Sequence, residues 1–138
     1  MMLERNKAAV RDYVAAFNAG DMTRLRAIFA KDAQIWGVLG AGGLDVAEPI
    51  WRELHESLEM RLEVMDMAAE GDRVAARFHE TGRFVAPFRV MPDIAPSGRS
   101  YSVTAMEWFV FDGAGRIATR WGARDSAAII RQLASARG

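Results

Sequence analysis

The stretch RSYSVTAMEWFVFDGAGRIATRWGAR, residues 99–124, decides the fold class. Its first half alternates apolar and polar residues over a long run, which is typical of a β-strand with one buried face. The segment DGAG at residues 112–115 is a turn signal, and RIATRWGAR at residues 116–124 has the length and composition of a second strand. The stretch therefore predicts an antiparallel β-hairpin.

The rest of the chain divides into a helical half and a strand half. Strand patterns recur in MRLEVMDMA and RVAARFHETGRFV, and the loop before the hairpin is interrupted by prolines. Before them, apolar residues at three- and four-residue spacing predict a first helix over 3–19. The remaining expected elements are a short helix from Asp21 to about Ala30, a strand in AQIWGVL followed by a flexible GAGG, a helix over 46–58 and a last helix over 126–134. Helices followed by strands predict an α+β fold with helices on one face of an antiparallel sheet, in a single domain spanning 1–138.

The composition excludes several classes of function. Among 138 residues, 18 basic side chains balance 18 acidic ones, so no net charge favours nucleic acid or an anionic membrane as a partner. Cysteine is absent, and the two histidines, His55 and His79, lack metal-ligand spacing, so we expect no metal site. No apolar run is long enough to span a bilayer, and the start of the chain lacks a signal core, so we expect a cytoplasmic protein.

Asp125 is the first candidate for chemistry. It shares its strand parity with Ile117, Thr119 and Trp121, whereas Arg120 and Arg124 take the other parity. This places the carboxylate on the face expected to be interior, where a charge is costly unless it is paired or its pKa shifts. The alternative is that Asp125 caps the helix that follows it.

Other candidates lie at positions where a pocket is expected. Glu107 has apolar residues on its own parity, so it is either a pocket group or a charge on an edge strand. Tyr13 lies on the apolar face of the first helix, where a tyrosine usually packs its ring and finds one partner for its hydroxyl. His79 is a candidate whose parity does not decide its direction. The residues expected to line the pocket and bind substrate are Trp36, Trp108, Trp121, Phe17 and Arg77.

These residues resemble a known family over nearly the whole chain. The segment YVAAFNAGDMTRLRAIFAKDAQI is similar to the opening of ketosteroid isomerases, and RWGARDSAAIIRQL resembles the ending of SnoaL-like polyketide cyclases. Both belong to the nuclear transport factor 2-like superfamily. The resemblance implies a cone-shaped α+β barrel in which three N-terminal helices pack on a curved, mostly antiparallel sheet that encloses a pocket.

The resemblance also implies roles for particular residues. In the isomerases the positions of Tyr13 and Glu107 donate hydrogen bonds to an oxyanion, although that family has aspartate where this chain has Glu107. The isomerase base is lost, because its matching position is Gly37. In the cyclases the position of Asp125 is the general acid or base. His79 matches a substrate-binding histidine by location alone, and the Arg77–His79 pair replaces the arginine–aspartate pair of limonene-epoxide hydrolases.

The resulting expectation is a cofactor-free enzyme that acts on a hydrophobic carbonyl compound. Asp125 removes a proton next to the carbonyl, and Tyr13 and a protonated Glu107 stabilise the enolate, which then closes a ring. The alternatives are a double-bond isomerase of the ketosteroid type, and a ligand-binding or dimerisation module without catalysis. Apolar residues at both parities of VTAMEWFVF predict a homodimer packed through the sheet.

Overall fold

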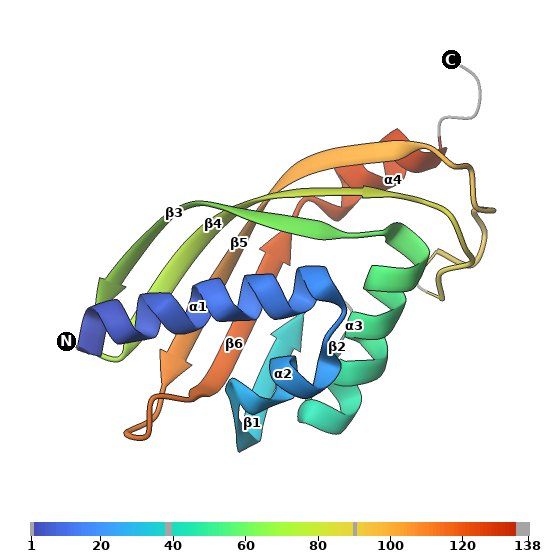
Figure 1. Cartoon of the computed structure of the whole chain (residues 1–138). Coiled ribbons are helices and arrows are strands. Elements are labelled where there is room, and N and C mark those ends of the chain that lie inside the picture. The colour runs from blue at the N-terminus through green and yellow to red at the C-terminus, as the bar shows by residue number, and fades with distance from the viewer. Residues whose placement is uncertain (1, 38–39, 90, 135–138) are drawn as a thin grey trace.

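A curved six-stranded sheet wraps around the first helix of the protein (Figure 1). This computed structural model describes residues 2–37, 40–89 and 91–134. The strand order is β2-β1-β6-β5-β4-β3, and all neighbours are antiparallel except β1 and β6. The strands are β1 (Phe29–Gly37), β2 (Gly40–Gly42), β3 (Arg61–Glu70), β4 (Arg73–Arg83), β5 (Ser100–Phe111) and β6 (Ile117–Arg124). The expected α+β class is confirmed, and the sheet stays open because β2 and β3 form its two edges.

Three helices lie in the first half of the chain and one at its end. They are α1 (Met2–Ala19), α2 (Met22–Ala27), α3 (Leu44–Leu58) and α4 (Ser126–Ala134). Gly20 adopts a positive φ of 69° and ends α1, and the Asp21 side chain accepts a hydrogen bond from the backbone N–H of Arg24 to cap α2. The second helix is shorter than expected, because β1 begins at Phe29.

The glycine-rich segment differs from its prediction. Gly40–Gly42 forms the short edge strand β2 rather than a flexible connection, and it pairs with Ile35–Gly37 of β1. Val38 and Leu39, which the expected strand included, lie outside the described residues. The third helix begins two residues before its predicted start, which moves Pro49 from the first helical turn into the second.

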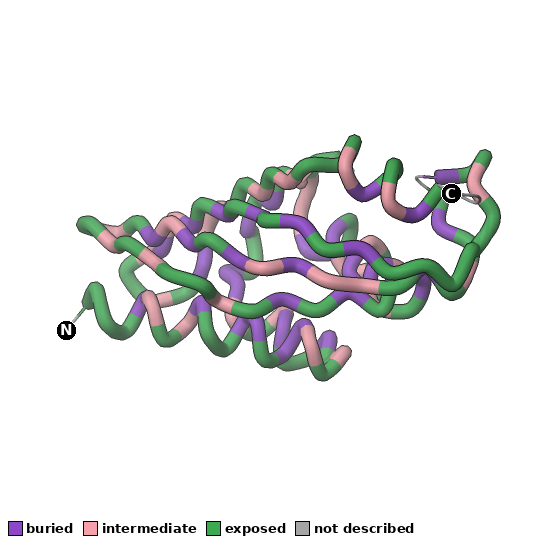
Figure 2. Tube along the Cα trace, turned by 90° about the horizontal axis from the view of Figure 1, so that it is seen from above, coloured by how far each residue is buried: buried purple, intermediate pink, exposed green. Residues whose placement is uncertain are grey.

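The predicted hairpin is confirmed as β5 and β6. Buried and exposed residues alternate along β5 as its sequence indicates, and the same alternation is visible along the strands in Figure 2. The pairing shifts by one residue between Val110↔Thr119 and Phe111↔Ile117. This β-bulge leaves Ala118 as an extra residue on β6 and reverses the faces of every later residue of that strand.

The core lies between the concave face of the sheet and helices α1 and α3. Val10, Tyr13 and Phe17 of α1 pack against inward residues of the strands, among them Phe78 and Phe109. Helix α4 packs at the end of β5, where the Gln132 side chain bonds to the backbone of Ser102. No helix in the described part of the chain is long and apolar enough to cross a membrane.

Candidate functional site

A cavity opens between the concave face of the sheet and the helices that cover it. Its walls come from α1, from α3 and from all six strands of the sheet. Its volume is about 70 Å³, measured as the space that the centres of water molecules can reach. One bound water needs roughly 10–15 Å³ on this measure, so the cavity admits several waters or a small ligand. Most of its lining is apolar, and its polar side chains come from two clusters.

The first cluster joins Tyr13, Glu107 and Arg120. The Tyr13 hydroxyl donates to Glu107 Oε1 at 2.9 Å, and Arg120 Nη1 donates to the same oxygen at 3.0 Å. Glu107 is 8% exposed and Arg120 is 9% exposed. Among the described residues nothing donates to Glu107 Oε2, and Arg120 Nη2 donates to no acceptor. The predicted meeting of Tyr13 and Glu107 in one cavity is confirmed, and the contact between them is direct.

The electrostatics of this cluster favour a charged pair. Burial raises the pKa of Tyr13, and the nearby Glu107 carboxylate raises it further, so the phenol stays protonated. Burial acts against the charge of Arg120, but Tyr13 and Glu107 outweigh it and leave the pKa of Arg120 above its usual value. Because Glu107 accepts from a tyrosine and a charged arginine, this geometry does not suit the expected role of Glu107 as a protonated donor.

Two glycines lie beside the arginine, and one of them makes room for it. A Cβ atom built on Gly122 lies 2.6 Å from Arg120 Nη1, so a side chain there displaces the guanidinium. On Gly37 the corresponding Cβ lies 3.5 Å from Arg120 Nη2. The position that carries the base in ketosteroid isomerases thus has no side chain here and lies at van der Waals distance from Arg120, and both glycines line the cavity.

The second cluster joins Glu80, Tyr101 and Arg124. The Tyr101 hydroxyl donates to Glu80 Oε2 at 2.6 Å, and Arg124 Nη1 lies 3.1 Å from the same oxygen. Glu80 is fully buried, and its Oε1 atom has no hydrogen-bond partner among the described residues. Burial raises the pKa of Glu80, whereas Arg124 and Tyr101 lower it and the Glu107 charge raises it. Glu80 and Arg124 line the same cavity as Glu107.

Asp125 does not face the interior, and this prediction was wrong. The residue is exposed, and its Oδ1 accepts a hydrogen bond from the backbone N–H of Ala128 at 2.9 Å. The bulge at Ala118 causes the error, because it turns Arg120 and Arg124 inward and Trp121 outward. The hydrogen bond from Ala128 agrees with the alternative prediction, that Asp125 caps α4. Asp125 is not among the residues that line the cavity.

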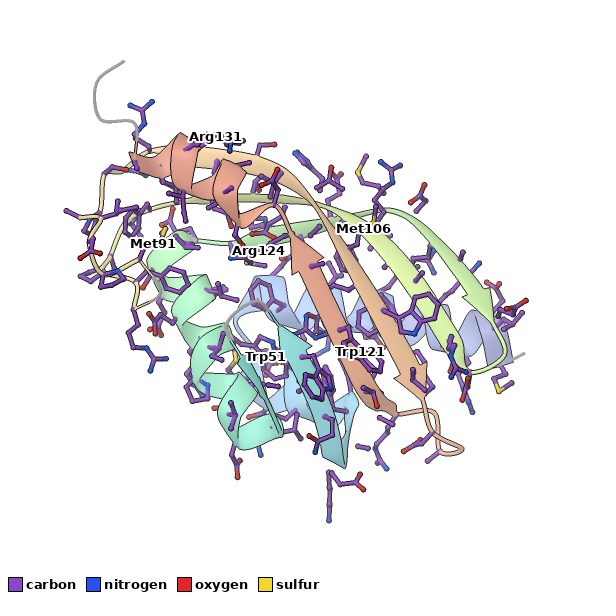
Figure 3. The ribbon with its side chains drawn as sticks, turned by 180° about the vertical axis from the view of Figure 1, so that it is seen from behind. Trp51, Met91, Met106, Trp121, Arg124 and Arg131 are labelled. Carbon is purple, nitrogen blue, oxygen red and sulfur yellow. The ribbon has the colours of Figure 1, made fainter. Side chains whose placement is uncertain are left out.

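The tryptophans expected to line the pocket also lie elsewhere. Trp36, Trp108 and Trp121 are 48%, 45% and 45% exposed, and they stand in register across β1, β6 and β5. Figure 3, seen from the side opposite to Figure 1, shows Trp121 and Met106 on the face of the sheet that α1 leaves uncovered. The side-chain alternation of β5 explains Trp108, since its neighbours Glu107 and Phe109 point inward.

The remaining predicted residues divide between the two faces. Phe17 lines the cavity, and its role in binding stays a prediction. Arg77 lies on the outer face in an ion pair with Asp66, whose carboxylate oxygens accept from it at 3.0 Å. His79 is on the same face, where its Nε2 lies 2.7 Å from Ser102 Oγ. The structure therefore brings neither Arg77 nor His79 to the cavity.

Sequence reasoning missed four residues of the two clusters. Strand parity could have identified Glu80 and Tyr101. Glu80 shares the parity of the apolar residues Val74, Ala76 and Phe78, and Tyr101 shares the parity of Glu107. Arg120 and Arg124 could not be identified in this way, because the bulge reverses the faces of these residues. Within residues 2–37, 40–89 and 91–134, no group of three acidic or histidine side chains is placed to hold a metal ion.

Comparison with known proteins identifies the family. The sequence profile of the SnoaL-like domain matches residues 10–120. The chain belongs to this family. The expected membership in the SnoaL-like branch of the nuclear transport factor 2-like superfamily is thereby confirmed.

Solved structures share the fold of this SnoaL-like domain over nearly its whole length. A proposed polyketide cyclase from Xanthomonas campestris superposes with a TM-score of 0.86 at 21% identity, covering 96% of this chain and 98% of that one. A proposed polyketide cyclase from Pseudomonas putida is 26% identical, with a TM-score of 0.77 and coverage of 91% and 96%. TsrD from Streptomyces laurentii is 25% identical, with a TM-score of 0.82 and coverage of 97% of both chains.

Proposed function

We propose that this SnoaL-like domain is an enzyme that moves a proton next to the carbonyl group of a hydrophobic small molecule. One observation carries the proposal: a carboxylate, Glu107, is held by Tyr13 and Arg120 inside a mostly apolar cavity. Burial of such a group among fixed donors is typical of sites that perform acid–base chemistry. The neighbours from Xanthomonas campestris and Pseudomonas putida, proposed polyketide cyclases, are consistent with a carbonyl substrate.

The proposed step uses Glu107 Oε2 and Arg120 Nη2, two atoms of the first cluster that have no described partner. Glu107 Oε2 takes a proton from the carbon next to the carbonyl, and the electrons of the C–H bond move to the carbonyl oxygen. Arg120 Nη2 donates to the resulting enolate oxygen, on the side where Gly37 leaves space. The enolate then regains its proton from Glu107, or its carbon attacks a second carbonyl of the same molecule, whose oxygen takes the proton. Tyr13 fixes the direction of the carboxylate.

Glu107 replaces Asp125 as the proposed base because of where the two carboxylates lie. Glu107 lines the cavity, whereas Asp125 is exposed and holds the first turn of α4. The isomerase alternative has no carboxylate at Gly37 to transfer the proton. Hydrogen–deuterium exchange next to the carbonyl of 2-tetralone, followed by NMR, tests the proposal, and binding of the ketone without exchange favours the ligand-binding alternative.

Substitution of Asp125 separates its two proposed roles. Asp125→Asn retains a good N-cap, so we expect its free energy of unfolding to stay within about 0.5 kcal/mol of the parent, whereas Asp125→Ala loses about 1 kcal/mol. Both variants are expected to exchange the ketone protons at the parental rate. Urea denaturation and the exchange assay measure the two effects. If the asparagine variant keeps its stability but loses exchange, Asp125 is the base.

We further propose that the outer face of the sheet is covered by a second copy of the chain. Trp36, Trp121 and Trp108 form one row on this face, and Met65 and Met106, both about half exposed, lie on the same sheet. A row of exposed aromatic side chains on an uncovered sheet favours association. A two-fold dimer uses the same patch on both subunits and buries it with a single contact.

Trp121 is the centre of this row, so its replacement is expected to disrupt the dimer. Trp121→Glu places a charge between Trp36 and Trp108, and loss of a central hot spot of at least about 2 kcal/mol raises the dissociation constant about 30-fold. Sedimentation equilibrium measures the change. Leu3→Glu, at an exposed position of α1, is the matched control and should leave the dimer intact. A monomeric parent protein at every concentration tested rules out this proposal.

A further inference from the structure

The second cluster lies in the same cavity as the proposed base but has no part in the proton transfer described above. Its carboxylate, Glu80, is 0% exposed, and both described contacts to it end on Oε2. Oε1 is buried without a hydrogen-bond partner among the described residues, and so is the Nε atom of Arg124. A buried carboxylate oxygen without a partner costs free energy, so an unfilled acceptor of this kind calls for an explanation.

The two clusters are built alike. Each contains a glutamate on a central strand, a tyrosine that donates to one carboxylate oxygen, and an arginine of β6 that contacts the same oxygen. The arginines are four residues apart on β6, so their backbone positions are about 13 Å apart along the strand. Their charges still act on each other, since the Glu107 carboxylate contributes to raising the pKa of Glu80. A ligand in the cavity thus meets two polar clusters among mostly apolar walls.

We propose that Glu80 and Arg124 form a second binding subsite that takes a hydroxyl group of the substrate. The hydroxyl hydrogen bonds to Glu80 Oε1, and the hydroxyl oxygen accepts from Arg124 Nε, so one group satisfies both buried atoms. Tyr101 is the positioning residue, because its hydroxyl occupies Oε2 and leaves Oε1 for the ligand. This inference rests on the proposed function and narrows its substrate to carbonyl compounds that carry a hydroxyl group at the far end of an apolar frame.

A matched set of ketones tests the subsite. The probes are 2-tetralone, its 6-hydroxy derivative and its 6-methoxy derivative, with dissociation constants measured by isothermal titration calorimetry on the parent protein and on Glu80→Gln. The parent should bind the hydroxy compound about tenfold or more tightly than either of the others, because only the hydroxyl donates to a carboxylate. In Glu80→Gln the amide nitrogen occupies the Oε1 position, since the amide oxygen keeps the bonds from Tyr101 and Arg124. An amide donates to both oxygen substituents, so the hydroxy and methoxy compounds should bind within about threefold of each other.

Further variants separate this inference from the proposed function. Tyr101→Phe retains the ring and frees Oε2, so the preference for the hydroxy compound should weaken. Glu107→Gln should lower the rate of exchange by about a hundredfold or more and keep the preference. Exchange of ketone protons without any preference for the hydroxy compound overturns the subsite and leaves the proposed function standing. A preference that disappears in Glu80→Gln, with no exchange in the parent, supports the subsite and overturns the function. If the parent binds none of the three ketones, the substrate class is wrong.

Discussion

Glu107→Gln should lower the rate of ketone proton exchange by about a hundredfold to ten-thousandfold, which is the usual loss when a general base is removed. The amide oxygen can still accept from Tyr13 and Arg120 at the Oε1 position, so the cluster keeps its shape. The amide nitrogen then stands where Oε2 was and cannot take a proton. Exchange of 2-tetralone protons, followed by NMR, measures the loss.

Two further variants serve as controls for this result. Glu107→Asp restores a carboxylate on a shorter side chain and should give an intermediate rate, because a base must reach the carbon that it deprotonates. Glu70→Gln makes the same chemical change at an exposed position of β3 and should leave the rate unchanged. Parental exchange in a folded Glu107→Gln protein rejects Glu107 as the base.

Arg120→Met is expected to lower the free energy of unfolding by about 3–5 kcal/mol, the cost of leaving one charge of a buried pair without its partner. The remaining Glu107 carboxylate keeps only the Tyr13 hydroxyl as a described donor, in a position that is 8% exposed. Methionine fills much of the volume of the arginine stem, so the change chiefly removes the charge. Urea denaturation measures the effect.

The arginine on the other side of the bulge supplies a control. Arg116 is exposed, and its side chain has no described ion pair, so Arg116→Met should change stability by less than about 0.5 kcal/mol. The double variant Arg120→Met with Glu107→Gln removes both charges and should recover part of the loss, which a double-mutant cycle records as coupling. A loss below about 1 kcal/mol in Arg120→Met contradicts a buried charged pair.

Local patterns in the sequence determined the layout of the fold. Alternation in residues 99–124 predicts the β5–β6 hairpin, and helical spacing predicts α1 with Tyr13 on its buried face. The parity of β5 left Glu107 either in a pocket or on an edge strand, and the resemblance to ketosteroid isomerases supplied the expectation that Tyr13 and Glu107 share a cavity. These inferences hold because side-chain direction repeats every two residues in a strand and every 3.6 residues in a helix.

The tertiary structure alone decided which residues of β6 face the cavity. The extra residue at Ala118 exchanges the two faces of the rest of β6. Arg120 and Arg124 therefore line the cavity, and Asp125 does not. A bulge depends on how two strands pair, and the residues of β6 read by themselves do not show it. The same holds for the tryptophan row, since register across β1, β6 and β5 brings Trp36, Trp121 and Trp108 together from distant parts of the chain. Periodicity fixes the face of a residue within an uninterrupted element, whereas pairing between elements fixes what that face meets.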